Sequence, residues 1–403
     1  MDCCFKAGNI LLPKDADFEK WAVIAVDQFT SDSAYWNRVE AHVLGVPSTL
    51  QMVLPEIYLE TEASGRIDSI AKAMNDYIAA EVFAEYPNAF IYVERTLLNG
   101  MIRPGIVGIV DLEQYHYDPA LKPAIGATEQ TILERVPPRI AVRREAALEF
   151  PHVILFCNDF ENRIVRPVGE KKEQLKKLYE FDLMEDGGHI AGWLVDGKDA
   201  EDLQAALSVY QKNAEGTAFL VADGNHSLVT AKCWYEELKQ ENPDEDLSNH
   251  PARYALVELE NILDDSIDFE PIHRVIFETD TEKLLADLKV HSCPEGSKIE
   301  CIVGNDCQIV NITVPAGELP VAVLQRFLDG WLAENAGKID YVHDRDAAEQ
   351  FAKTENTVSI LLPVFDKAEL FAFGAAGKIL PRKTFSLGHG REKRYYLEGR
   401  KIR

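Results

Sequence analysis

Short apolar runs alternate with amphipathic segments between residues 152 and 240, and this rhythm constrains the fold more than any other feature of the sequence. The apolar runs are short and bounded by turn residues, so they predict buried strands at 152–159, 189–196 and 217–223. Amphipathic or charged segments at 170–184, 199–214 and 225–240 predict helices, the first of them ended by the turn in MEDGGHIAGW (184–193). Strands alternating with helices predict a mixed α/β fold.

The rest of the chain also combines the two periodicities. Strands are expected at 21–28, 89–97 and 100–112, and a smaller α/β region at about 276–365. A helix is expected over 64–86, where apolar residues recur at helical spacing: Ile67, Ile70, Ala71, Met74, Ile78 and Val82. We therefore divide the chain into an N-terminal α/β region (1–150), a β/α region (151–275) and a C-terminal α/β region (276–403).

Charge and composition exclude several classes of protein. The 67 acidic and 42 basic residues give a net charge of −25, which repels nucleic acid and anionic membranes, so neither is an expected partner. The chain has no apolar stretch of the roughly 20 residues that a membrane span needs, and its start does not resemble a signal peptide. We expect a cytoplasmic protein without a disulfide framework, since its seven cysteines show no paired spacing. The sequence leaves the oligomeric state open.

FLVADGNHSLVTA (219–231) is the strongest candidate for a binding site. An apolar run ends at Asp223-Gly224, and a helix with Asn225 as its N-cap is expected to follow. A first helical turn offers unpaired backbone N–H groups to an anion, Gly224 permits close approach, and His226 can move a proton near neutral pH. Asp223 could hold a hydroxyl group or a divalent cation. A capped turn without a ligand remains the alternative, because turns commonly use the same residues.

Three other charged groups have both a functional and a structural interpretation. His273 and Arg274 could bind a phosphate, or lie exposed on an edge strand. Glu129 precedes a series of arginines that could form a solvated face. Arg95 follows Glu94 inside an apolar strand, where an unpaired charge is costly. An internal ion pair between the two would explain why both charges occur there. The motifs of P-loop, dinucleotide-binding, HExxH and GxSxG enzymes do not occur.

Three motifs in the same order resemble a family of conserved proteins of unknown function that carries an ADGHHR signature. The motifs are ATEQT (127–131), ADGNHS (222–227) and EPIHRVIF (270–277), which resemble the family's HExT, ADGHHR and PTHR elements. That family belongs to the ParB/sulfiredoxin-like superfamily and is related in motif to the ADP-dependent free serine kinase. The resemblance implies a nucleotide-binding core of that type, with additional α/β regions.

The resemblance also implies roles for individual residues. Glu129, Asp223 and His226 would be catalytic, and Asp223 would hold Mg²⁺. The nucleotide, such as ADP, ATP or CTP, would be bound through its phosphates by Gly224, Asn225, Ser227, His273, Arg274 and Arg95. This sequence departs from the signature at Asn225, which replaces a histidine, and at Ser227, which replaces an arginine that stabilises phosphate charge in relatives.

These observations favour an enzyme that transfers a phosphoryl group between a nucleotide and a small metabolite. A ParB-like regulatory or interaction protein that binds a nucleotide or another anion without catalysis is the alternative. A third hypothesis makes Asp223, His226 and His273 ligands of a hydrolytic metal, although their spacing matches no metal motif.

Overall fold

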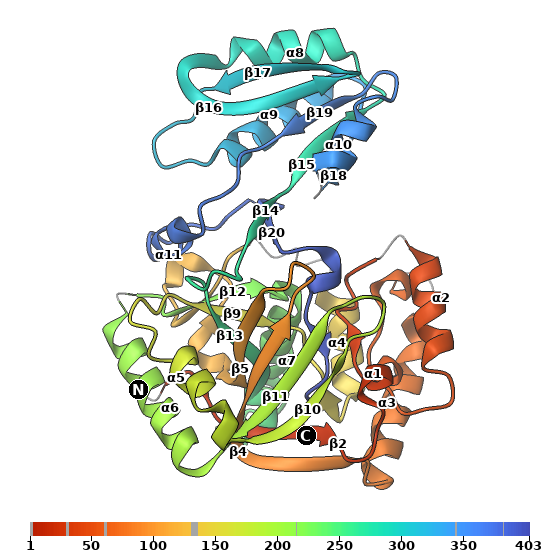
Figure 1. Cartoon of the computed structure of the whole chain (residues 1–403), viewed down its shortest axis with the longest axis vertical. Helices are drawn as coiled ribbons and strands as arrows, with labels where there is room; N and C mark the ends of the chain where they lie inside the picture. Colours follow the sequence, from red (N-terminus) through yellow and green to blue (C-terminus); the bar gives the residue numbers. More distant parts are fainter. Residues whose placement is uncertain are drawn as a thin grey trace. The chain divides into compact units, whose positions relative to one another are not determined.

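The protein folds into two compact units, each of which combines helices with a sheet (Figure 1). The computed structural model describes residues 3–29, 32–59, 63–129, 136–214, 216–342, 345–381 and 383–403. Unit 1 comprises Met1–Ile267, Ala368–Ile379 and Gly390–Arg403, and unit 2 comprises Asp268–Lys367 and Leu380–His389. The mixed α/β class predicted from the sequence is confirmed. Within the described residues, no helix has both the length and the apolar character that crossing a membrane requires.

A large mixed sheet forms the centre of unit 1. Its strands lie in the order β10, β11, β4, β5, β13, β9, β12, β7 and β6, while β1 pairs with β5 and β2 with β4. The pairs β9–β13, β7–β12 and β6–β7 are parallel, and the other pairs are antiparallel. The strands span Phe5–Lys6 (β1), Gly8–Pro13 (β2), Phe83–Thr96 (β4), Ile102–Asp111 (β5), Tyr115–His116 (β6), Ile125–Ala127 (β7), Ile154–Cys157 (β9), Lys176–Asp182 (β10), His189–Val195 (β11), Phe219–Asp223 (β12) and Tyr254–Asn261 (β13). Strands from before and after residue 150 share this sheet. The boundary proposed at residue 150 between an N-terminal and a middle region remains a prediction.

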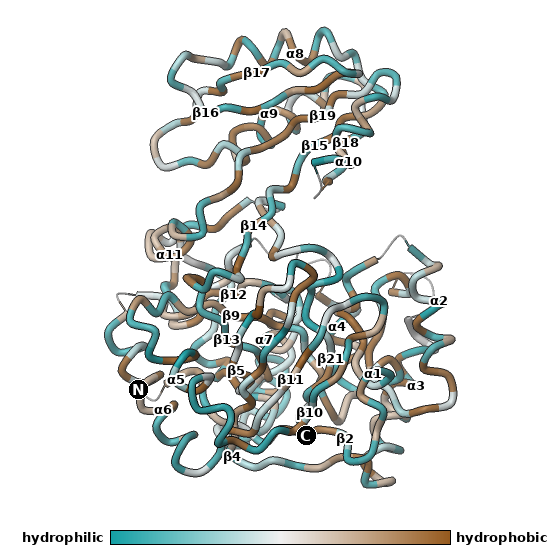
Figure 2. The backbone as a smooth tube through the Cα atoms, in the orientation of Figure 1, coloured by the Kyte–Doolittle hydropathy of each residue, from teal (hydrophilic) through white to brown (hydrophobic). Residues whose placement is uncertain are grey.

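Helices pack their apolar faces against this sheet. Helix α6 buries Ala200, Leu203 and Leu207, whose spacing of three and four residues places them on one face. Figure 2 shows hydrophobic residues along the strands and hydrophilic residues over much of the helical and loop surface. The helices of unit 1 span Phe18–Trp21 (α1), Ser33–His42 (α2), Ala63–Ala79 (α3), Val136–Glu145 (α4), Val165–Glu170 (α5), Gly197–Asn213 (α6), Asn225–Glu241 (α7) and Leu370–Ala375 (α11).

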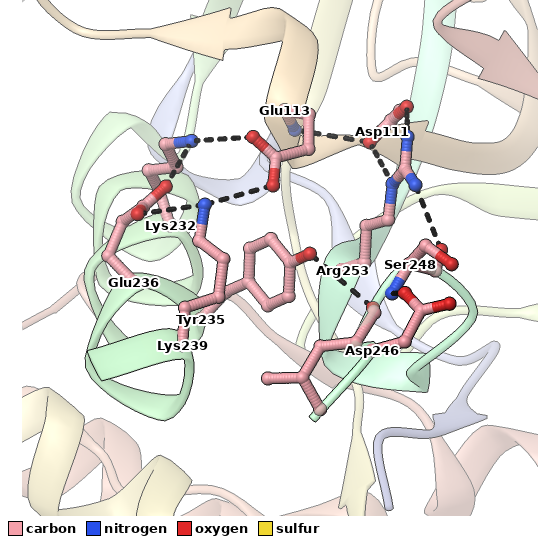
Figure 3. A network of polar contacts seen from close by, with 10 residues as sticks. Asp111, Glu113, Lys232, Tyr235, Glu236, Lys239, Asp246, Ser248 and Arg253 are labelled. Atoms are coloured by element: carbon pink, nitrogen blue, oxygen red, sulfur yellow. Dashed lines mark hydrogen bonds and ion pairs between the residues drawn. The ribbon is translucent and has the colours of Figure 1, made fainter. Parts of the chain in front are cut away.

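Helix α7, which carries the ADGNHS motif at its start, is fixed by apolar and by polar contacts. Its buried residues include Leu228, Val229 and Trp234. A polar network borders this buried face (Figure 3): Lys232 and Lys239 pair with Glu113 and with Glu236 on the helix itself. In the same network, both carboxylate oxygens of Asp111 at the end of β5 accept hydrogen bonds from Arg253, at 2.8 and 2.7 Å. Exposed ion pairs are individually weak, but together with the buried face they hold α7 in one position.

The helix predicted over 170–184 is wrong, because that segment forms a short 3-10 turn at Lys172–Gln174 and then the edge strand β10. Its side chains alternate after Leu178: Tyr179 and Phe181 pack near Phe18, whereas Glu180 and Asp182 are exposed, as are Lys176 and Lys177 at its start. Charged lysines on an edge strand discourage pairing with other chains, and their number made the segment resemble an amphipathic helix. The turn in MEDGGHIAGW accordingly connects β10 to β11, with Gly188 at φ +89° and a 2.8 Å hydrogen bond from Leu183 N to its carbonyl, and does not end a helix.

Three further elements differ in extent from the prediction. Helix α3 ends at Ala79, so Val82 lies outside it, and β4 begins at Phe83, well before residue 89. The early start of β4 comes from pairing with β2, a partner more than 70 residues away in the sequence. Only Val23–Ile24 (β3) forms a strand within the predicted 21–28. Long-range pairing decided these ends, and local periodicity does not record it.

The C-terminal residues run through the interior of unit 1. Strand β21 (Tyr395–Tyr396) pairs with β3, and β22 (Arg400–Lys401) pairs with β8 (Leu148–Glu149). Arg394 and Arg400 are buried, and each forms ion pairs with buried glutamates. The basic tail therefore neutralises charge inside the unit, where ion pairs are screened less than on the surface.

Buried charges also surround Glu260 on β13, whose side chain is only 2% exposed. Burial raises the pKa of Glu260 to about 8, Glu258 and Asp264 raise it further, and Arg103 and Arg95 oppose the shift. The folded state thus favours the protonated form of this carboxyl, whereas the unfolded chain ionises it near its usual value of about 4.3.

We expect the stability of unit 1 to fall as the pH rises from about 4.3, where the unfolded carboxyl ionises, to about 8, where the folded one does. A carboxyl whose folded pKa is raised stabilises the fold fully below its unfolded pKa, and that contribution is lost by the time the pH passes the folded pKa. Glu260→Gln should make the melting temperature less dependent on pH between about pH 5 and pH 8. Glu201→Gln, at an exposed position, is the matched control. An unchanged pH dependence in Glu260→Gln would contradict this expectation.

Unit 2 is a smaller α/β unit with its own core. Its five-stranded sheet has the order β17, β16, β19, β15 and β18 among the described residues, and its core includes Val275, Ile302 and Leu361. The strands span His273–Phe277 (β15), Ser292–Val303 (β16), Asp306–Ile312 (β17), Lys338–Val342 (β18) and Val358–Leu361 (β19), and β14 (Phe269–Pro271) pairs separately with β20 (Phe385–Leu387). Its helices span Thr281–Val290 (α8), Pro320–Glu334 (α9) and Arg345–Phe351 (α10). The boundary proposed at 275 falls inside β15 and remains a prediction.

Candidate functional site

The ADGNHS motif forms the predicted strand, turn and helix. Strand β12 ends at Asp223, Gly224 adopts a left-handed conformation at φ +76°, and the 17-residue helix α7 begins at Asn225. The N-cap residue is Gly224 and not Asn225, because the turn requires the positive φ that glycine tolerates best. A Cβ on Gly224 would lie 3.0 Å from Val153 Cα, so the turn also packs closely on the neighbouring backbone.

Parallel pairing brings the first and second motifs together. Strands β7 and β12 are parallel neighbours, so residues that follow their carboxyl ends lie at the same edge of the sheet. Thr128 Oγ1 donates to the carbonyl of Val221 at 2.6 Å, and Asn225 Nδ2 lies 3.5 Å from the same hydroxyl oxygen. Glu129 follows directly and is half-buried. The other two residues of ATEQT, 130 and 131, lie outside the described residues.

A lysine from the C-terminal segment completes this cluster, and the sequence did not indicate it. Lys393 is 9% exposed, and its Nζ lies 3.0 Å from Asp223 Oδ2. Burial lowers the pKa of Lys393, but the negative charges of Asp223, Asp27 and Glu129 outweigh it and raise the pKa above its usual value. The ammonium group is therefore charged at neutral pH; it contacts Asp223 and is acted on by the negative charges of Asp27 and Glu129.

Asp27, which interacts electrostatically with Lys393, pairs with His152. His152 Nε2 is 3.8 Å from Asp27 Oδ1, and its Nδ1 is 3.0 Å from the hydroxyl of Tyr396, which also accepts from the backbone N–H of Val26. Burial raises the pKa of Asp27, but His152 and Lys393 lower it more, so the carboxylate is ionised. Asp27 and His152 each border an apolar run in the sequence. That position is the only sequence feature that could have indicated them as site residues.

His226 and Ser227 occupy the first turn of α7, and both are partly exposed. The carbonyl of His226 accepts a 2.7 Å hydrogen bond from Thr230 Oγ1, which belongs to the helix itself. Ser227 offers a hydroxyl group but no charge, so the positive charge in this cluster comes from elsewhere in the chain.

Arg95 is buried and donates its hydrogen bonds to backbone carbonyls. Its guanidinium donates to the carbonyls of Glu392 at 2.8 Å and Lys393 at 2.6 Å, and more weakly to those of Arg391 and Gly187. Glu94 forms its ion pair with Lys172, at 2.6 Å. The described contacts of Glu94 and Arg95 therefore do not include the ion pair expected between them. Arg95 thus holds the backbone that carries Lys393.

His273 and Arg274 belong to unit 2, and their observed contacts lie within it. Arg274 is fully buried and donates to the carbonyls of Ile272 and Lys383 and to Gln325 Oε1. His273 Nδ1 accepts from the backbone N–H of Leu362 at 3.2 Å. Both residues are buried in β15, which contradicts the exposed edge-strand interpretation.

Several solved structures resemble this chain remotely, and no protein of curated function matches it. Free serine kinase in complex with AMP is 12% identical, with 72% of this chain and 90% of that chain covered and a TM-score of 0.38. A conserved hypothetical protein from Pyrococcus furiosus is 10% identical (72% and 90% covered, TM-score 0.34), and SbnI with a C-terminal truncation from Staphylococcus aureus is 8% identical (70% and 82% covered, TM-score 0.37). At TM-scores this low, these likenesses carry no argument about how this chain works.

The family comparison is more extensive. The family described as Protein of unknown function (DUF1015) matches residues 9–367. The match includes all three motifs around Glu129, Asp223 and His273, and ends before the segment that contributes Lys393. Because it covers well over half of the chain, this protein belongs to the DUF1015 family.

Proposed function

We propose that unit 1 binds a nucleotide at the start of α7 and transfers a phosphoryl group between it and a small metabolite. The observation that carries the proposal is the cluster at one edge of the sheet, where a helix N-terminus with a left-handed glycine lies beside an ammonium group and three carboxylates. Free N–H groups and the helix dipole favour phosphate there. The order of the three motifs, which resembles that of the family with the ADGHHR signature, supports the same ligand class.

The side chains around the turn suit different parts of the reaction. The backbone of Gly224 and Asn225, with the imidazole of His226 and the hydroxyl of Ser227, would contact the phosphates. A metabolite hydroxyl would attack the terminal phosphorus, its proton would pass to Glu129 or Asp223, and the departing nucleotide oxygen would keep the electron pair of the broken bond. ADP, ATP and CTP are the nucleotides to test.

Mg²⁺ is the divalent ion expected with such phosphates. Among the described residues, no three or more His, Cys, Asp or Glu side chains are grouped to hold a metal by themselves. Mg²⁺ commonly takes one or two carboxylates and completes its shell with phosphate oxygens and water, and the carboxylate oxygens of Asp223 and Asp27 fit that partial role. The ion would supply neutralisation of phosphate charge.

Titration calorimetry with ADP, ATP and CTP, each with Mg²⁺, tests the proposal. We expect at least one nucleotide to bind, and His226→Ala to weaken that binding by roughly tenfold or more, as loss of a hydrogen bond to a charged group would. His42→Ala, in the exposed last turn of α2, is the matched control and should bind as the wild type does. Absence of binding by all three nucleotides at millimolar concentration would refute the proposal.

A further inference from the structure

The positive charge of the site comes from a residue outside the recognised motifs. We propose that Lys393 binds the phosphate of the ligand directly, exchanging its ion pair with Asp223 for a contact with a phosphate oxygen. This inference rests on the proposed function of the same site and adds the residue that recognises the anion. Lys393 reaches the cluster from the buried C-terminal segment, and its ammonium already lies 3.0 Å from the strand end that precedes α7.

The other cations named for this role are already engaged. Arg95 donates to backbone carbonyls of residues 187 and 391–393, and Arg274 is buried in unit 2 against its own carbonyl and amide partners. Ser227, in the first turn of α7, has no charge. Lys393 combines position and charge, since the carboxylates around it keep the amine protonated. A protonated amine attracts an anion and cannot act as a nucleophile.

The backbone of Lys393 is fixed, while its side chain is long enough to change partner. Arg95 holds the carbonyls of Glu392 and Lys393, and the next residue, Arg394, pairs with Glu258 and Glu398 at 2.6 Å each. The carbonyl of Arg394 also accepts from the N–H of Ala25 at 3.1 Å. Arg95 is therefore a positioning residue: it places the lysine without contacting the ligand.

Charge explains why the ion pair with Asp223 can be exchanged. Asp27, Asp223 and Glu129 all act on Lys393 with negative charge, while His152 and Arg139 act on Asp27 with positive charge. A phosphate that enters beside these carboxylates is repelled unless the ammonium turns towards it. Lys393 should therefore increase the affinity for ligands that carry phosphate and leave the affinity for an uncharged nucleoside unchanged.

Binding of ADP, pyrophosphate and adenosine to the wild type, Lys393→Met and Lys393→Arg tests this inference, with Mg²⁺ held constant. We expect Lys393→Met to weaken ADP and pyrophosphate by about tenfold to a hundredfold and to leave adenosine unchanged. Lys393→Arg, which keeps the charge, should recover most of the affinity for ADP. Lys401→Met removes an exposed lysine from the same segment and should match the wild type.

Three results would overturn the inference. The first is ADP affinity in Lys393→Met within twofold of the wild type, and the second is an equal loss of affinity for adenosine. Circular dichroism checks the fold of each variant, and Lys393→Gln, which keeps hydrogen-bond donors for Asp223, replaces Lys393→Met where that variant does not fold. The third result is a wild type that binds neither ADP nor pyrophosphate, which would remove the proposed function as well.

Discussion

Arg394→Met is expected to lower the free energy of unfolding of unit 1 by about 3–5 kcal/mol, the cost of leaving buried charges without their partner. Arg394 is 5% exposed and pairs with Glu258 and Glu398, each at 2.6 Å, and both carboxylates are buried. Its guanidinium also donates to the carbonyl of Pro151. Burial lowers the pKa of Arg394, but the negative charges of Glu398 and Glu258 raise it more, so the guanidinium stays charged. Methionine fills a similar volume and neutralises neither glutamate.

Chemical denaturation at neutral pH measures this loss. Arg38→Met is the matched control, because Arg38 forms a 2.7 Å pair with Glu185 but is 52% exposed, so its loss should destabilise unit 1 far less than Arg394→Met does. Adding Glu258→Gln and Glu398→Gln to Arg394→Met should restore part of the stability, since the uncompensated charges then disappear. An Arg394→Met variant as stable as Arg38→Met would show that the buried pairs contribute little.

Gly224→Ala is expected to destabilise unit 1 by about 2–4 kcal/mol and to abolish ligand binding at the start of α7. A residue with a side chain is strained at φ +76°, and its Cβ would lie 3.0 Å from Val153 Cα and 3.1 Å from Val153 Cγ2. Relief of either problem must shift the turn or the start of β9, and both border the carboxylate cluster. The backbone N–H groups of the first turn would then no longer be aligned for a phosphate.

Gly197→Ala separates conformational strain from crowding. Gly197, at the start of α6, also has a positive φ of +50°, but a Cβ there would meet nothing within 4 Å. Alanine at this position should cost only the strain of the left-handed conformation, about 1–2 kcal/mol, with ligand affinity unchanged. Thermal melting and calorimetry of both variants compare the two effects. Equal destabilisation at the two glycines would mean that the contact with Val153 has no consequence.

Local sequence patterns were sufficient for the strand, turn and helix that carry the motif. The apolar run up to Val221, the Asp-Gly pair and the helical spacing after it all act within about 20 residues, so β12 and α7 could be predicted from them. The same reasoning failed at 170–184, where a lysine-rich edge strand carries as much charge as a helix. It also misplaced the cap, because the sequence does not reveal that Gly224 packs on Val153.

The proximity of Glu129 and Asp223 required the sheet. Their separation in the sequence is 94 residues, and parallel pairing of β7 with β12 places them at one edge. Lys393 and Asp27 arrive through β21 and β3, which pair across more than 370 residues. For Arg95 the sequence suggested a contact with a ligand, because the residue is charged. In the structure its guanidinium donates hydrogen bonds to backbone carbonyls.

The sequence by itself determined the mixed α/β class, the strand–turn–helix around residues 219–241 and the residue types suited to an anion, because periodicity and turn chemistry are local properties. Only the tertiary structure decided which charges meet there. The strength of a charge depends on its burial and its neighbours, and these come from strand pairing between distant segments. The site therefore includes a lysine ten residues from the C-terminus, placed beside Asp223 by a buried tail.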